Sequence, residues 1–117
     1  MSSNKKYEIT RLRNSNIVNK GKEIIYEILK CNSTFSVALA EVRGENSAHY
    51  HKKLTEIYHI VDGSGILVLD GKEVSVQKGD TILIYPRTVH QIKSEYIKIL
   101  VIATPPFSEK DYFEVSK

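Results

Sequence analysis

Residues 44–63 read GENSAHYHKKLTEIYHIVDG, and this stretch carries the pattern on which the fold and the function depend. Successive side chains of a β-strand point to opposite faces, so His49 and His51 share a face while Tyr50 points the other way. Glu56 follows a short turn and begins the next strand, from which it can face the two histidines. The stretch therefore predicts two strands joined by a turn, with three metal-binding side chains directed at one point.

A second stretch, residues 79–90 with the sequence GDTILIYPRTVH, supplies a third histidine. The turns at Asp70-Gly71 and Gly79-Asp80 would bring the strand of His90 alongside the first two. Three imidazole nitrogens and one carboxylate oxygen suit one divalent transition metal (Fe, Mn, Ni, Zn, Co or Cu). They are too rich in nitrogen for a calcium or magnesium cage. A His-x-His pair also occurs by chance on protein surfaces, so the residues alone leave both interpretations open.

Strand-forming segments recur on both sides of these motifs. Asp70-Gly71 is a strong hairpin signal, because both residues tolerate positive φ. Residues 22–30 also fit a helical stripe, but their β-branched content and the Asn32-Ser33 turn favour a strand. Strands at this spacing predict an all-β, antiparallel sandwich or barrel. The other expected strands are 35–42, 56–61, 66–69, 73–76, 81–85, 89–93 and 96–103.

The two ends of the chain differ from this middle. Residues 1–20 are expected to form an N-terminal arm, with a strand around residues 7–12. Residues 21–117 would form the barrel and its C-terminal tail. Within that tail, residues 108–111 resemble a capping box and predict one helical turn.

Composition narrows the class of protein. A chain of 117 residues has room for one domain. Its net charge of +3 is spread along the chain, without the basic stripe of a nucleic-acid-binding protein. The apolar stretch at 97–107 is interrupted by Lys98, Thr104 and two prolines, so no membrane span is expected. The single cysteine, Cys31, and a polar start without a signal sequence predict a cytoplasmic protein, in which Cys31 is a small structural thiol.

Both motif stretches resemble a known family. Gly44…His49-x-His51-x4-Glu56-x6-Gly63 is similar to the first conserved motif of the cupin superfamily, and Gly79-x5-Tyr85-Pro86-Arg87-Thr88-Val89-His90 to the second. The closing residues 100–107 resemble the tail of small single-domain cupins with a type 2 barrel. The sequence departs from the pattern in three ways. Gly44 and His49 are one residue closer, Tyr85 and Arg87 stand where proline and glycine are usual, and Ser94 replaces an asparagine.

This resemblance implies a jelly-roll barrel, also called a double-stranded β-helix, with a metal bound inside by His49, His51, Glu56 and His90. It also implies a homodimer, made by exchange of N-terminal strands. The function expected on this basis is a metal-dependent enzyme that acts on a small oxygenated substrate molecule, with dioxygenase as first choice. The alternatives are an isomerase or decarboxylase acting on a sugar or keto acid, and a non-catalytic ligand-binding cupin. One ligand set serves all of these, so the fold does not choose the reaction.

Two further residues are candidates for catalysis. Tyr58 shares the predicted inward face with Glu56, and its phenol could act as an acid or hydrogen-bond the substrate; it could equally be a core aromatic. Arg87 precedes His90 near the barrel mouth and could hold a carboxylate or phosphate, or could be a solvated turn residue. His59 faces the opposite side and is expected to be a packing or interface residue.

Overall fold

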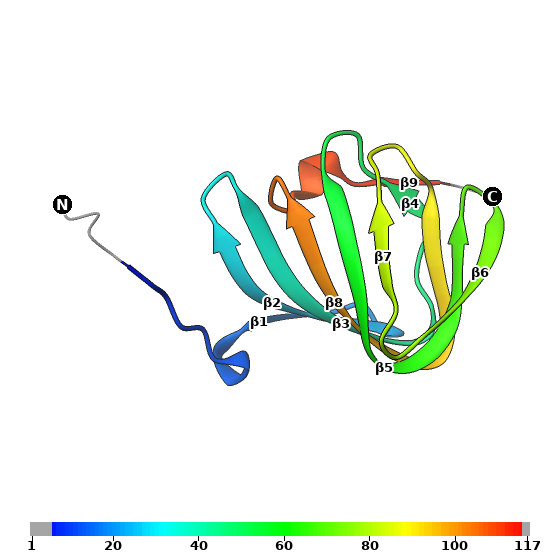
Figure 1. The fold of residues 1–117 in the computed structure, drawn as a ribbon, viewed down its shortest axis with the longest axis horizontal. Coiled ribbons are helices and arrows are strands. Elements are labelled where there is room, and N and C mark those ends of the chain that lie inside the picture. Colours follow the sequence, from blue (N-terminus) through cyan, green and yellow to red (C-terminus); the bar gives the residue numbers. More distant parts are fainter. Residues whose placement is uncertain (1–5, 116–117) are drawn as a thin grey trace.

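The computed structural model describes residues 6–115, and β-strands make up most of them (Figure 1). Two single turns of 3-10 helix, η1 (Leu12–Asn14) and η2 (Glu109–Asp111), lie near the two ends. The predicted all-β fold is confirmed. The strands are β1 (Asn16–Asn19), β2 (Glu23–Cys31), β3 (Phe35–Glu45), β4 (His49–Tyr50), β5 (Thr55–Leu69), β6 (Lys72–Gln77), β7 (Thr81–Ile84), β8 (His90–Thr104) and β9 (Phe113–Glu114).

The strands form one antiparallel sheet that curls into a barrel (Figure 1). Its order runs β1-β2-β3-β8-β4-β9, and β5 joins through β8 while also pairing with β6 and β7. The long strand β8 is central, because it pairs with β3, β4 and β5 along its length. Residues from distant parts of the sequence therefore meet inside the barrel.

Strands β5 and β8 are each longer than the sequence predicts. One strand, β5, contains both of the segments expected to be separate, 56–61 and 66–69. Its register against β8 shifts between Ile60 and Asp62 and again between Ser64 and Ile66. Gly63 has a φ of +80°, and an added Cβ would overlap the carbonyl oxygen of Tyr96. The glycines thus mark bulges that bend a continuous strand rather than a turn that ends it. Segments 89–93 and 96–103 likewise merge into β8.

The inward faces of the strands build the core. Along β5, Glu56, Tyr58 and Ile60 are buried while His59 is exposed, which confirms the predicted alternation. Burying a large aliphatic side chain contributes about 1.5–3 kcal/mol, so this cluster supplies much of the stability of the barrel. Its buried members are Val42, Tyr58, Ile60, Leu67, Val76, Ile84, Ile92, Ile97 and Ile99.

The two ends of the chain are placed differently. Residues 6–11 form no strand, and the strand that the 1–20 arm contributes is β1, which pairs with the edge of β2. A strand exchanged with a second copy stays a prediction, and residues 1–5 of the arm lie outside the described residues. Tyr7, Ile9 and Leu12 are exposed, and this segment extends away from the barrel (Figure 1). At the other end, Ser108 caps η2 as predicted. The C-terminal segment crosses one end of the barrel, where β9 pairs with β4. None of the described residues belongs to a helix long and apolar enough to cross a membrane.

Candidate metal centre

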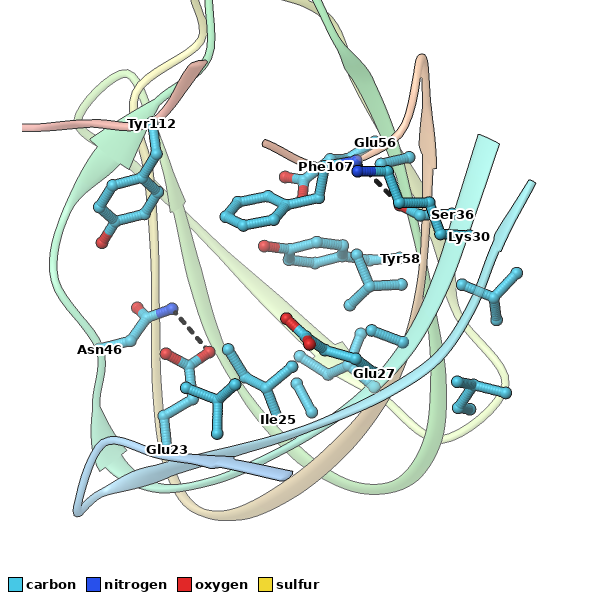
Figure 2. Close-up of a pocket in the computed structure, with 18 of the residues that line it drawn as sticks. Glu23, Ile25, Glu27, Lys30, Ser36, Asn46, Glu56, Tyr58, Phe107 and Tyr112 are labelled. Atoms are coloured by element: carbon cyan, nitrogen blue, oxygen red, sulfur yellow. Dashed lines mark hydrogen bonds between the residues drawn. The ribbon is translucent and has the colours of Figure 1, made fainter. Parts of the chain in front are cut away.

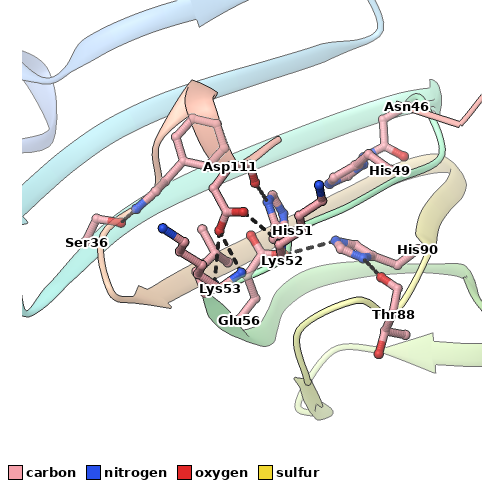
Figure 3. A network of polar contacts seen from close by, with 12 residues as sticks. Ser36, Asn46, His49, His51, Lys52, Lys53, Glu56, Thr88, His90 and Asp111 are labelled. Carbon is pink, nitrogen blue, oxygen red and sulfur yellow. Dashed lines mark hydrogen bonds and ion pairs between the residues drawn. The ribbon is translucent and has the colours of Figure 1, made fainter. Parts of the chain in front are cut away.

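The four side chains predicted as metal ligands converge in the barrel (Figure 3). His49 on β4 lies opposite His90 on β8 in the sheet, His51 directly follows β4, and Glu56 is near the start of β5. All four are buried, at no more than 7% exposure. One ligand atom from each lies within 4.8 Å of the others. These four residues could therefore hold a metal ion.

Hydrogen bonds to backbone carbonyls orient the three imidazoles. A carbonyl oxygen can only accept, so each Nδ1 atom carries the proton and donates it, and a neutral ring keeps its lone pair at Nε2. Histidines that bind metals are held in this way by their second nitrogen. The Nδ1 atom of His49 donates to the carbonyl oxygen of Ser47 (2.8 Å), that of His51 donates to the carbonyl oxygen of Asp111 (2.7 Å), and that of His90 donates to the carbonyl oxygen of Thr88 (2.9 Å).

The surroundings of Glu56 fit a cation. Its Oε1 atom lies 3.0 Å from Nε2 of His90 and 3.4 Å from Nε2 of His51. Among the described residues, the buried Nε2 of His51 has no hydrogen-bond partner. With the protons on Nδ1, the nitrogen lone pairs face the carboxylate, and a proton or a metal ion is needed between them. A divalent transition metal would be held by these four residues and would satisfy all of them at once.

The pKa values of two of these groups follow from burial and from their neighbours. Burial, followed by the charge of His90, lowers the pKa of His49 to about 4. Burial alone would raise the pKa of Glu56, but the imidazoles of His51 and His90 outweigh burial and bring it to about 2. At neutral pH the cluster therefore offers a neutral imidazole at His49 and an ionised carboxylate at Glu56, which are the forms that bind metal.

The C-terminal segment fixes the loop that carries His51 (Figure 3). The carboxylate of Asp111 accepts hydrogen bonds from the backbone N–H groups of Lys52 (2.8 Å), Lys53 (3.0 Å) and Leu54 (3.1 Å). The carbonyl oxygen of the same residue accepts from His51. Asp111 thus fixes both the loop and the imidazole of His51, and it connects the C-terminal segment to the four candidate ligands.

A cavity of about 690 Å³ opens onto the cluster (Figure 2). This volume is in the range of small-molecule sites. Three of the four ligands, His49, His51 and Glu56, belong to its wall, and so does Tyr58, whose ring meets the ring of His90 edge-on at 6.0 Å between centroids. Phe107 and Tyr112 from the C-terminal segment cover the histidines, with Tyr112 stacked on His49 at 4.8 Å. Candidate metal ligands in a wall with more apolar than polar surface could bind an oxygenated small molecule.

Comparison with known proteins agrees with this architecture. The model of the cupin domain family matches residues 36–103, a range that holds all four candidate ligands. The chain belongs to the cupin family. It is 35% identical over 103 residues to an uncharacterized protein of Methanocaldococcus jannaschii. The aligned region covers 80% of this cupin and 82% of that protein.

Three further comparisons concern proteins whose names state an activity. Over 63 residues the cupin is 30% identical to quercetin 2,3-dioxygenase of Bacillus subtilis, which covers 52% of the chain and 19% of that enzyme. A Streptomyces nucleoside dehydratase, Pac13, has been solved as a variant with uridine. It matches with a TM-score of 0.84 at 21% identity, over 95% of this chain and 91% of that one. The polyketide cyclase RemF of Streptomyces resistomycificus matches with a TM-score of 0.78 at 17% identity, over 95% of this chain and 87% of that one. These structural likenesses show the fold.

The remaining sequence candidates occupy different places in the cupin. Tyr58 is buried in the cavity wall, where burial and then the charge of Glu56 raise the pKa of its phenol well above the usual value. Arg87 is exposed and is not among the residues that line the cavity. Its φ of +69° explains why the family has glycine at this position, and its N–H donates to the carbonyl of His51 at 2.6 Å. A substrate role for Arg87 stays a prediction. His59 is exposed and contacts Thr81.

Sequence reasoning missed three residues of the site. Glu23 and Asn46 belong to the cavity wall, and Asp111 anchors His51. Asn46 lies inside the first motif stretch, so its position near the ligands could have been noticed. Glu23 and Asp111 come from distant segments and carry no local signal.

Proposed function

We propose that this cupin is a metal-dependent enzyme that acts on a small oxygenated molecule, and that the reaction is a dioxygenation. The observation that carries the proposal is the cluster of His49, His51, Glu56 and His90 beside a cavity of about 690 Å³. An ion held there would supply Lewis-acid activation and, with iron or another redox-active metal, electrons for O2. The identity with quercetin 2,3-dioxygenase, although limited to 63 residues, supports this choice of reaction.

The protein's own residues would bind and orient the substrate. Because its pKa is raised, Tyr58 keeps its proton at neutral pH and can donate a hydrogen bond to a substrate oxygen. Phe107 and Tyr112 cover the histidine rings and shield the site from water. The hydrogen bonds of the three Nδ1 atoms hold the imidazoles in place before the substrate enters.

Oxygen consumption tests this proposal. Protein loaded in turn with Fe(II), Mn(II), Ni(II), Co(II), Cu(II) or Zn(II) would be incubated with flavonols, β-diketones and α-hydroxy acids in an oxygen electrode. Turnover should consume O2 and should disappear in metal-stripped protein and in His49→Ala, while His59→Ala, which changes an exposed histidine, should keep it. Full activity in metal-stripped protein would refute the metal role, and turnover without O2 would refute dioxygenation.

A second candidate is proton-transfer chemistry, as in an isomerase or decarboxylase acting on a sugar or keto acid. The observation in its favour is the carboxylate of Glu23 in the cavity wall, because burial raises its pKa and so makes it a better proton carrier. Product formation at an equal rate with and without O2 would select this reaction. A ligand that raises the melting temperature but is recovered unchanged would instead indicate a non-catalytic binding protein.

We also propose that the cupin is a homodimer in the cytoplasm. The exposed apolar side chains of Tyr7, Ile9, Leu12 and Ile17, near and on the edge strand β1, support an interface with a second copy. The single cysteine supports a reducing compartment. Sedimentation should give twice the monomer mass, and a double variant, Ile9→Asp with Ile17→Asp, should give the monomer mass.

A further inference from the structure

The cavity wall carries a pair of polar side chains that the proposed metal chemistry does not use. Glu23 lies at the start of β2 and Asn46 directly follows β3, and their side chains lie next to each other in the cavity wall (Figure 2). The amide of Asn46 donates to Oε2 of Glu23 at 3.5 Å, which is a long hydrogen bond. Within residues 6–115, it is the only side-chain hydrogen bond to this carboxylate. A partly buried carboxylate with free acceptor sites is costly unless a donor reaches it.

Asn46 is held firmly in this position. Its Oδ1 atom accepts from the backbone N–H of Ile92 at 2.9 Å, and its carbonyl oxygen accepts from the side chain of Gln91 at 2.7 Å. The side-chain oxygen is therefore occupied, and the NH2 group must point toward Glu23 and the cavity. Together, Glu23 offers acceptors and Asn46 offers a donor, in fixed orientation. This is the pattern that recognises hydroxyl groups, which both donate and accept.

The charge around this pair favours a neutral ligand over a cation. Lys20 belongs to the same cavity wall, and its positive charge lowers the pKa of Glu23, although burial outweighs it and the pKa is raised overall. An ammonium group entering here would meet Lys20 as well as Glu23. A hydroxyl group would meet no such repulsion and could donate to Glu23 in either protonation state of the carboxyl.

We propose that Glu23 and Asn46 form a recognition site for the uncharged, hydroxylated part of a substrate whose other oxygens bind at His49, His51, Glu56 and His90 in the same cavity. This inference deepens the proposed function and rests on it. The substrate class is a small molecule with metal-binding oxygens at one end and at least two hydroxyl groups at the other. Apolar residues of the same cavity wall, among them Ile25, Ala40 and Ile99, would contact its carbon skeleton.

A matched pair of ligands tests the proposal. D-Ribonate and 2-hydroxypentanoate share the α-hydroxy acid head, but the tail of the first carries hydroxyl groups and that of the second is a plain alkyl chain. Their affinities would be measured by titration calorimetry on protein loaded with Zn(II), which is redox-inactive and leaves the ligands intact. Ribonate should bind about tenfold or more tightly than 2-hydroxypentanoate, the effect of one hydrogen bond to a charged group.

Variants assign this preference to Glu23. Glu23→Ala should lower the ribonate affinity about tenfold and leave the affinity for 2-hydroxypentanoate and the zinc content unchanged. Glu23→Gln keeps the shape of the side chain, so it should fold normally and lose part of the preference. Glu73→Ala, an exposed glutamate on β6 outside the cavity, is the control and should change neither affinity.

The outcomes distinguish a failure of the Glu23–Asn46 site from a failure of the metal site. Zinc-loaded protein that binds the two acids equally, binds neither, or keeps its preference in both Glu23 variants overturns this inference and leaves the metal site standing. Protein that takes up no metal overturns the proposed function, and this inference with it.

Discussion

Removing the carboxylate of Asp111 should weaken metal binding, although Asp111 is not itself a ligand. The carboxylate accepts three backbone hydrogen bonds from residues 52–54, and the carbonyl oxygen of Asp111 orients His51. A hydrogen bond to a charged group contributes about 1.5–3 kcal/mol. Lys52 and Lys53 are exposed, so water can replace their bonds, but the N–H of the buried Leu54 would lose its partner.

The loss of stability in Asp111→Ala therefore corresponds to about one hydrogen bond to a charged group. Because Asp111 is itself partly exposed, we expect the free energy of unfolding to fall by about 1.5–2 kcal/mol, near the low end of that range. Loosening the loop that carries His51 should also weaken metal affinity about tenfold, the lower end of the effect of losing a residue that orients a ligand.

Two measurements check this reasoning. Competition with a chelator gives the metal affinity, and urea unfolding of metal-free protein gives the stability. Asp111→Asn keeps one acceptor oxygen and should show about half of each loss, while Glu109→Ala, which changes an exposed residue of the same η2 turn, should show neither. If Asp111→Ala binds metal as tightly as the unchanged protein, the tail does not position His51.

Three further predictions concern pH, the loop before His90 and the core. In metal-free protein, His49 has a pKa near 6.5 in the unfolded chain and about 4 in the folded state, so the unfolded state binds the proton first as pH falls. The free energy of unfolding should therefore decrease as pH drops from 6.5 to about 4. Urea midpoints measured across this range should decrease less in His49→Gln. Arg87→Gly should raise the free energy of unfolding by up to about 1 kcal/mol, because glycine accepts the φ of +69° without strain; a large fall in thermal stability would contradict this. Leu67→Ala should cost about 2–5 kcal/mol in urea unfolding, since Leu67 is fully buried, while Leu83→Ala, at a half-exposed position, should change stability by less than about 0.5 kcal/mol.

Local signals in the sequence were sufficient where the chain repeats with a period of two. Alternation around Glu56, Tyr58 and Ile60 predicted which side chains point inward, and the Asp70-Gly71 turn predicted the hairpin that follows. They were misleading where a glycine cluster bends a strand. Gly63-Ser64-Gly65 has the composition of a turn, yet strand β5 runs through it because β8 continues to pair on both sides.

The sequence by itself determined the all-β class, most strands of the barrel and, through the resemblance of its two motifs, the four candidate ligands, because alternation and motif spacing can be read along the chain. Only the tertiary structure decided what surrounds those ligands. Glu23 reaches the cavity because β2 packs into the same curled sheet, and Asp111 reaches His51 across 60 residues because the tail folds over the end of the barrel. Such contacts depend on how the sheet closes and on the register of strands far apart in sequence, which local patterns do not specify.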